Sequence, residues 1–192
     1  MTGRPFRGAH SPGPRPPFAV DRLGGARPCP VLSTERLALG PLTLADWPAV
    51  REVMTGPRAR YMGGPYTEIA AWTAFVTDVG SWGLTGSGGV AARASDGALV
   101  AMIWLNDLPV FHEPEMGWMT TAAAEGQGYA TEAAAAVLDW VRAEVRPASL
   151  VSYVDRANPR SEAVARRLGA APDPAAWAPG PEDRAWRHEV AA

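Results

Sequence analysis

Apolar and polar positions alternate in some short segments of the chain and recur at helical spacing in others. Alternation predicts strands over residues 35–42, 90–94, 99–105, 115–121, 150–155 and 186–190. Helical spacing predicts helices over residues 43–54, 67–82, 129–145 and 158–168. The elements therefore follow one another as βα, α, βββ, α, β, α, β, which indicates a mixed α/β domain.

Turn and cap residues support the boundaries of several of these elements. Thr43 and Asp46 have the spacing of a capping box at a helix start. Residues 95–98 read Ser-Asp-Gly-Ala between two strand patterns, which is typical of a hairpin turn. Asn158 and Pro159 are the residue types favoured at the N-cap and first position of a helix.

The first 30 residues differ from the rest of the chain. They contain seven Pro, five Gly and five Arg, and they show no apolar periodicity. A segment of this kind buries little surface, so we expect residues 1–30 to be a disordered or extended tail. We expect residues 31–192 to form one domain, with order beginning near Ser33, and the tail to be dispensable for folding.

Composition excludes several classes of function. The net charge of −2 favours neither nucleic acid nor an anionic membrane as a partner. Cys29 is the single cysteine, and the three histidines lack metal-ligand spacing, so we expect neither a disulfide nor a metal site. No apolar run approaches the ~20 residues of a membrane span, and no secretory signal opens the chain. These patterns predict a cytoplasmic protein.

The stretch from Met116 to Glu132 contains the most specific pattern in the chain. An apolar strand pattern ends near Thr120, Gly126 and Gly128 follow in a polar turn, and a helix opens at Tyr129. Glycines let a ligand approach the backbone closely, and the N–H groups of a first helical turn attract anions. The sequence therefore predicts a phosphate-binding turn.

This stretch also resembles the acetyl-coenzyme A signature of the GNAT N-acetyltransferases, written Arg/Gln-x-x-Gly-x-Gly/Ala. Gly128 and Ala130 fill its last two fixed positions, and the run from Gly126 to Ala133 is typical of the RimJ/RimL-like branch. The resemblance implies the GNAT fold, a mostly antiparallel mixed sheet splayed at the cofactor strand and flanked by helices. It also implies acetyl transfer from acetyl-coenzyme A to a primary amine by direct attack in a ternary complex.

The resemblance assigns roles to residues by motif position. It implies that the strand backbone pairs with the pantetheine arm, that the turn and first helical turn hold the diphosphate, and that an Asn after the next strand touches pantetheine. The corresponding residues are Trp118, Met119 and Thr120 for the strand, Gly126, Gln127, Gly128, Tyr129, Ala130 and Thr131 for the turn, and Asn158. Core packing for the strand side chains and N-capping for Asn158 remain alternatives.

One position departs from the signature. The Arg/Gln position is Glu125, an acid beside the expected diphosphate site. A carboxylate there should repel a polyanion, so the sequence predicts that Glu125→Gln raises the affinity for acetyl-coenzyme A.

Two residues are candidates for proton transfer. Glu115 opens the cofactor strand and is the candidate general base, with Glu113, His112 and His188 as alternatives. Ser161 is the candidate acid for the leaving thiolate, because Ala165 stands where other GNAT branches carry a Tyr. A structural role at the strand opening for Glu115 and in the first helical turn for Ser161 remains open.

Two other functions compete with N-acetyl transfer. A catalytically weak acyl-coenzyme A-binding module and a purely structural α/β domain both fit the same turn. The acceptor, a small-molecule or peptide amine, is not specified, and a homodimer stays open. Five aromatic residues either wall an acceptor pocket or belong to the core: Tyr61, Tyr66, Trp72, Trp82 and Phe111.

Overall fold

The computed structural model describes residues 22–190 of the 192-residue chain. Within that range the strands form an eight-stranded sheet in the order β1-β2-β3-β4-β5-β6-β8-β7. The strands are β1 (Leu32–Ser33), β2 (Ala38–Pro41), β3 (Gly88–Arg93), β4 (Leu99–Asn106), β5 (Glu115–Thr120), β6 (Val151–Asp155), β7 (Ala171–Pro172) and β8 (Asp183–Arg187).

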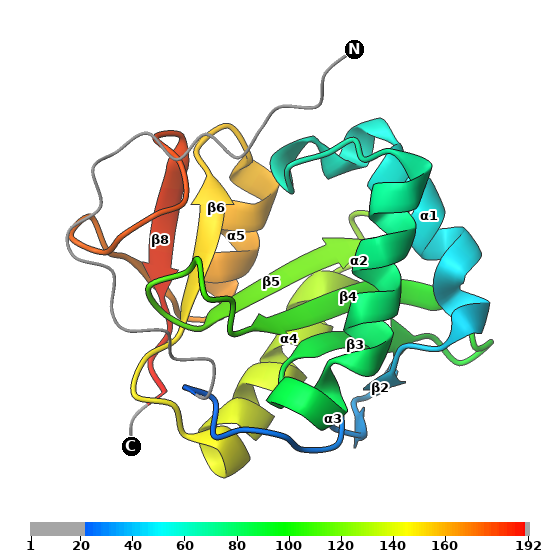
Figure 1. Ribbon diagram of the computed structural model, residues 1–192, viewed down its shortest axis with the longest axis horizontal. Coiled ribbons are helices and arrows are strands. Elements are labelled where there is room, and N and C mark those ends of the chain that lie inside the picture. The colour runs from blue at the N-terminus through cyan, green and yellow to red at the C-terminus, as the bar shows by residue number, and fades with distance from the viewer. Residues whose placement is uncertain (1–21, 191–192) are drawn as a thin grey trace.

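The sheet consists of two antiparallel parts that meet at a short parallel contact. Strands β1 to β5 pair antiparallel in chain order, and β8 pairs antiparallel with both β6 and β7. β5 and β6 run parallel, and the only register pair between them is Glu115 with Val151. Beyond this pair the strands separate into a wedge, as Figure 1 shows. The predicted α/β fold, splayed at the strand that begins at residue 115, is therefore confirmed.

Helices cover both faces of the sheet (Figure 1). They are α1 (Trp47–Thr55), α2 (Glu68–Gly80), α3 (Trp82–Thr85), α4 (Tyr129–Trp140) and α5 (Pro159–Arg167), with the 3₁₀ helices η1 (Leu44–Asp46) and η2 (Pro57–Tyr61) and the π-helical turn η3 (Val141–Val145). One apolar cluster fills the space between the sheet and α4, and a second fills the space between the sheet and the α1–α2 layer. A smaller cluster joins β6, α5 and β8. The two faces of β5 therefore belong to different layers.

The local signals in the sequence have their expected structural effects. Thr43 and Asp46 form the capping box, which opens η1 and leads into α1. Gly97 has a φ of 83° in the β3–β4 turn, a left-handed value that favours glycine. The Asn158 side chain accepts a hydrogen bond of 3.2 Å from the Ser161 N–H and so caps α5. The predicted caps and hairpin are confirmed.

Some predicted boundaries and faces are wrong in detail. The last strand ends at Arg187, so His188 lies just beyond β8 instead of within it. The long helix changes from α to π geometry after Trp140. Ile69 is 70% exposed on α2, while Ala71 and Phe75 are its buried residues. The helix predicted over residues 67–82 is present as α2, and Ile69 is an apolar residue on its exposed face.

The predicted tail boundary is wrong for residues 22–30. Leu23 is 1% exposed and belongs to the core cluster between the sheet and α4. The Arg22 backbone N–H and guanidinium both bond the Asp107 carboxylate, and the Arg27 N–H donates to the Trp82 carbonyl at 3.2 Å. Residues 22–30 therefore pack onto the domain. The rest of the predicted tail, residues 1–21, lies outside the described range.

No helix in residues 22–190 is long and apolar enough to cross a membrane. The same range contains no group of three or more His, Cys, Asp or Glu side chains placed to hold a metal ion.

Candidate functional site

Strand β5 has one paired edge and one edge that is largely free of a strand partner. Its β4 edge is paired from Glu115 to Thr120. On its β6 edge the ladder consists of the Glu115–Val151 pair, and the Ser152 hydroxyl bonds the Met116 carbonyl. The following residues, Gly117 to Thr120, have no register partner in β6. An extended ligand could pair with this edge as an added strand.

The turn after β5 has the backbone shape of an anion site. Gly126 and Gly128 have φ values of 77° and 82°, and Gly128 is the N-cap of α4. A Cβ added at Gly126 would meet no atom within 4 Å, so the space beside this glycine is open. The first turn of α4 begins with Tyr129 and directs its N–H groups toward the same end.

An ion pair fixes the first turn of α4 from the side. Arg36, in the loop between β1 and β2, pairs with Glu132 and donates to the Gln127 carbonyl at 3.1 Å. Its guanidinium also lies 4.6 Å from the centre of the Tyr129 ring. The Thr34 hydroxyl donates to the same Glu132 carboxylate at 2.5 Å. These contacts hold the glycine turn against the edge of the sheet.

Glu125, the residue that departs from the signature, lies in an ion cluster with two arginines. Its carboxylate pairs with Arg58 from η2 and with Arg160 from the first turn of α5. Arg58 also donates through Nη2 to the Thr120 hydroxyl and carbonyl at 3.3 and 3.4 Å. The negative charge that should repel a polyanion is therefore matched by two positive charges at the end of β5.

Asn158 and Ser161 form a closed pair at the start of α5. The Asn158 amide Nδ2 donates to the Ser161 hydroxyl at 3.0 Å, and Asn158 Oδ1 accepts from the Ser161 N–H. Across the wedge, the Tyr61 hydroxyl donates to the Ala157 carbonyl at 2.8 Å. The N-cap role of Asn158 is thus present, and both side chains lie beside the open end of the wedge.

The Glu115 carboxylate lies at the other end of β5, on the face that α1 and α2 cover. It is buried, and it accepts a hydrogen bond of 2.7 Å from Asn106 Nδ2. Burial raises the pKa of Glu115 to about 7, against the lowering effect of the Asn106 hydrogen bond. A Cβ at Gly117 would stand 3.0 Å from Glu115 Oε1, so the carboxylate extends along the strand over this glycine.

A second carboxyl group faces the same side of the sheet. Asp78 on α2 accepts a hydrogen bond of 2.7 Å from Trp104 Nε1, and Trp104 is the β4 partner of Gly117. Burial raises the pKa of Asp78 to about 6. Glu115 and Asp78 thus lie on either side of Trp104, and both carboxyls titrate nearer to neutrality than an exposed acid.

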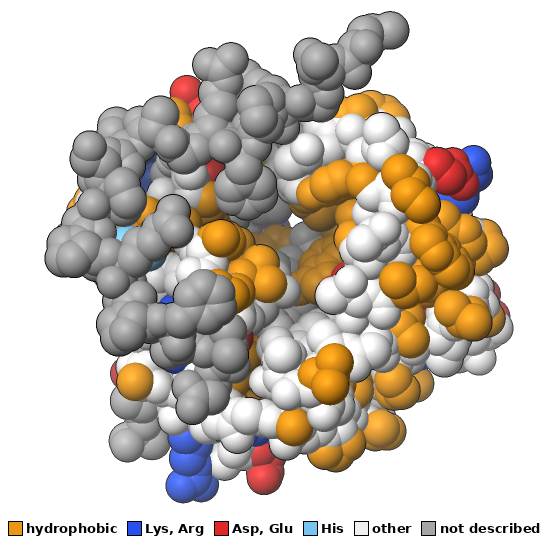
Figure 2. Space-filling model, viewed as in Figure 1, with side chains coloured by type: hydrophobic (Ala, Val, Ile, Leu, Met, Phe, Trp, Pro, Cys, Tyr) orange, Lys and Arg blue, Asp and Glu red, His pale blue; other side chains and the backbone are white. Residues whose placement is uncertain are grey.

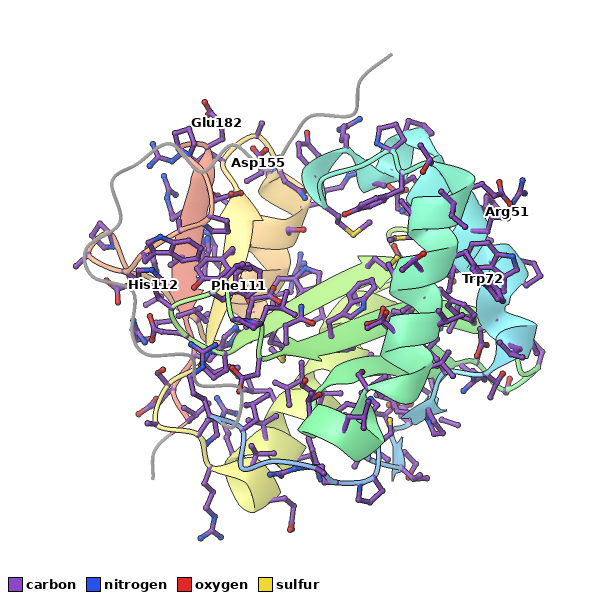
Figure 3. All side chains as sticks on the ribbon, viewed as in Figure 1. Arg51, Trp72, Phe111, His112, Asp155 and Glu182 are labelled. Atoms are coloured by element: carbon purple, nitrogen blue, oxygen red, sulfur yellow. The ribbon has the colours of Figure 1, made fainter. Side chains whose placement is uncertain are left out.

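Aromatic rings flank Glu115 on the β6 side. Tyr153 packs against Phe111 and Trp177 with ring centres 5.2 and 5.5 Å apart, and His112 stacks on Trp177 at 4.5 Å. The buried Tyr153 hydroxyl has no hydrogen-bond partner among the described residues. Figure 3 shows Phe111 and His112 beside β6 and β8, and Figure 2 shows a hollow between this side and α2. This hollow is the candidate acceptor site.

The alternative bases have other partners. Glu113 pairs with Arg187, and this contact holds the pKa of the carboxyl below its usual range. His188 hydrogen-bonds the Ser152 hydroxyl at 2.8 Å inside the core, and burial lowers its pKa to about 4. Ser152 alternates with Tyr153 along β6, so His188 reaches the strand from the face opposite the hollow.

The five aromatic residues considered as pocket walls do not lie together. Trp82 is buried and packs against Trp140, while Trp72 contacts Trp47 on the outer side of α2. Figure 3 shows Trp72 far from Phe111. These two tryptophans are packing residues. The interpretation that all five aromatic residues wall one pocket is therefore wrong.

Comparison with known proteins identifies the family to which this chain belongs. Residues 36–171 match the family model described as Acetyltransferase (GNAT) domain. The chain belongs to the GNAT acetyltransferase family. The predicted family is therefore confirmed, and this acetyltransferase has the wedge and the glycine turn in the order that the signature implied.

Several solved structures resemble this acetyltransferase. An acetyltransferase from Agrobacterium tumefaciens is 41% identical with a TM-score of 0.79, covering 83% of this chain and 94% of that one. RimJ from Mycobacterium smegmatis, in complex with CoA-disulfide, is 17% identical with a TM-score of 0.60, covering 79% and 80%. A spermidine N-acetyltransferase from Vibrio cholerae, in complex with CoA and spermine, is 14% identical with a TM-score of 0.59, covering 80% and 94%. The last two share the fold alone. No curated protein matches the chain.

Sequence reasoning missed two residues that the acetyltransferase brings to the glycine turn. Arg58 follows the Gly-Pro pair that ends α1, and Arg36 lies in an ordinary-looking loop. Their partners Glu125 and Glu132 are 67 and 96 positions away. No local sequence pattern indicates contacts between residues so far apart in the chain, so these contacts become visible only in the folded structure.

Proposed function

We propose that this acetyltransferase transfers the acetyl group of acetyl-coenzyme A to a primary amine by direct attack in a ternary complex. The observation that supports this most is the unpaired edge of β5, which leads from the buried Glu115 carboxyl to the glycine turn at Gly126 and Gly128. An amine acceptor and an extended acyl donor can meet along one strand in this arrangement.

The residues along this edge fit the cofactor. The backbone of Trp118, Met119 and Thr120 would pair with the pantetheine arm, since β6 leaves that edge without a register partner. The turn from Gly126 to Thr131 would hold the diphosphate, and Asn158 would lie beside the arm. The bound donor would supply an acetyl thioester, which is an activated carbonyl.

Glu115 would accept the proton of the attacking amine. Its pKa of about 7 suits a base that works near neutral pH, because the carboxylate is then available and still basic enough to hold a proton. The carboxylate lies over Gly117 on the same strand whose edge would hold the donor, so the amine proton could pass to it directly or through one water. The amine nitrogen then bonds the acetyl carbon as the carbon–sulfur bond breaks.

Ser161 would donate a proton to the departing sulfur and would take one back from solvent, which restores its hydroxyl. Its hydroxyl is already held by Asn158 Nδ2, so the oxygen accepts one hydrogen bond and keeps its own hydrogen free to donate. A thiol has a pKa near ~8.5, so this donation assists the departure of the thiolate without being indispensable.

An acyl-enzyme on cysteine is a poor alternative. Cys29 is the single cysteine of the chain, and burial raises the pKa of its thiol to about 12. A thiol that stays protonated at neutral pH is a weak nucleophile. Direct attack by the amine is the route that these residues favour.

Steady-state kinetics with a panel of amines tests this proposal. We expect thiol release that depends on both substrates, with intersecting double-reciprocal lines. Parallel lines would indicate an acyl-enzyme and contradict direct attack. Coenzyme A binding in calorimetry without turnover of any amine would favour the alternative, a catalytically weak acyl-coenzyme A-binding module.

A further inference from the structure

The ion cluster of Glu125, Arg58 and Arg160 lies where four elements of the site converge. Glu125 belongs to the glycine turn, Arg58 to η2 and Arg160 to the first turn of α5, and Arg58 also reaches Thr120 at the end of β5. Because α5 follows β6, the Glu125–Arg160 pair connects the two sides of the wedge at its open end.

The two arginines have the chemistry of phosphate ligands. A guanidinium presents a planar set of donors that matches phosphate oxygens as well as carboxylate oxygens. The side chain of Arg58 is 30% exposed, so part of its guanidinium is open to an incoming anion. The side chain of Arg160 is 81% exposed and can move to a new anion at small cost.

We propose that Arg58 and Arg160 are the cations that bind the diphosphate of the donor, and that Glu125 holds them as an internal anion that the diphosphate displaces. The proposal rests on the proposed function, because it assumes that a coenzyme A thioester enters the wedge. The family signature has Arg or Gln at the position of Glu125. In the proposal, Arg58 and Arg160 supply the positive charge that an arginine there would provide.

The energetics favour such an exchange. Ion pairs that reach solvent contribute little stability, so breaking both Glu125 contacts costs little. A diphosphate brings more negative charge than one carboxylate, and the N–H groups of the first turn of α4 add to its binding. Glu125 should therefore reduce donor affinity without abolishing it, and it should keep the two guanidiniums at the turn until the donor arrives.

The test compares Arg58→Gln, Arg160→Gln and Glu125→Gln with two matched controls. Arg60→Gln changes an exposed arginine on η2 whose guanidinium lies over the Tyr61 ring, and Arg167→Gln changes an exposed arginine on α5. Coenzyme A affinity is measured by calorimetry at low and high salt. Turnover is measured with acetyl-coenzyme A and with acetyl-pantetheine, which keeps the thioester but carries no phosphate.

We expect each of the two arginine variants to lose about tenfold in coenzyme A affinity, with a weaker dependence on salt. The ratio of kcat/KM for acetyl-coenzyme A to that for acetyl-pantetheine should fall about tenfold in both. Glu125→Gln should raise coenzyme A affinity about threefold or more at low salt, and inorganic pyrophosphate should inhibit this variant more strongly than wild type. The two control variants should match wild type in all three measurements.

Wild-type coenzyme A affinity in both arginine variants would overturn the proposal, as would weaker binding by a folded Glu125→Gln variant. Equal losses with both thioesters would also overturn it, because they would indicate a structural role for the arginines. Failure of the proposed function looks different, since wild type would then turn over neither thioester. Melting temperatures of all variants identify any that fail to fold. Arg58→Met and Arg160→Met, which keep an unbranched side chain but remove the charge, then replace those and carry the same expected losses.

Discussion

Two glutamates lie at opposite ends of strand β5, and their surroundings differ. One is the first residue of the strand, and the other lies in the turn that follows it. Glu115, at the start of the strand, is buried with one neutral hydrogen-bond donor, and its pKa is raised to about 7. Glu125, after the end of the strand, lies between two arginines at the protein surface. The same type of side chain is therefore suited to proton transfer at Glu115 and, in the proposal above, to a change of ion-pair partner at Glu125. The difference comes from the neighbours, since desolvation favours the neutral acid and guanidinium favours the anion.

The largest expected effect comes from removing the base at the buried end. Glu115→Gln keeps the size and the Asn106 contact but cannot accept a proton, so kcat should fall by about 100- to 10,000-fold. In wild type, kcat/KM should rise with pH through about 7 as Glu115 loses its proton. The variant should lack this inflection while coenzyme A still binds, and an unchanged pH profile would remove Glu115 from the mechanism.

The same substitution should reveal the cost of the buried charge. The folded pKa of Glu115, about 7, lies above its ordinary value of 4.5, so the folded state binds more protons between these pH values. Wild-type stability should therefore fall as pH rises from 4.5 to 7, and Glu115→Gln should gain up to about 3 kcal/mol over wild type by pH 8. Denaturant unfolding at pH 5 and pH 8 measures this gain. A similar pH-dependent gain in Glu125→Gln would break the contrast between the two residues.

At the glycine turn, we expect a substitution that strains the backbone to weaken coenzyme A binding. Gly128→Val adds a branched side chain at a φ of 82° beside the proposed diphosphate site, and coenzyme A affinity should fall at least tenfold, or about 1.4 kcal/mol. Gly97→Val is the matched control, because Gly97 has a φ of 83° in the β3–β4 turn. Both variants should lose stability, but only Gly128→Val should lose affinity in calorimetry.

The smallest expected effect is at Ser161. Ser161→Ala should lower kcat by about tenfold and leave KM for acetyl-coenzyme A nearly unchanged, since the thiolate is only a moderately poor leaving group. Thermal unfolding of the same variant measures any loss of the contacts with Asn158, which should stay within about 1 kcal/mol. Lower stability with an intact kcat would reduce Ser161 to a capping residue.

The fold and the glycine turn were predictable because their signals are local. Alternation and helical spacing depend on neighbouring positions, and Gly126 and Gly128 adopt the positive φ that their residue type permits. Leu23 gave no such signal, since a lone apolar residue in a Pro-, Gly- and Arg-rich segment forms no period. The packing of residues 22–30 onto the core therefore could not be predicted.

The ion pairs and shifted pKa values of the site also could not be predicted from the sequence. The charge of Glu125 suggested repulsion, but its effect depends on Arg58, a residue 67 positions earlier. The raised pKa of Glu115 comes from its burial in the folded domain, against the lowering effect of the hydrogen bond from Asn106 on the neighbouring strand. Tertiary contacts of this kind set the charge state of a residue, while the sequence indicates only its type.

The single register pair between β5 and β6 fixes where the wedge is narrow. Glu115 and Val151 form that pair, so the candidate base lies at the apex of the wedge. β6 extends four residues beyond the apex to Asp155, a length of about 13 Å at ~3.3 Å per residue. The gap beside β5 therefore grows from the candidate base toward the end of the strand that leads into the glycine turn (Figure 1). A donor that pairs with the edge of β5 would have its slender thioester end at the narrow part and its bulky end at the wide part.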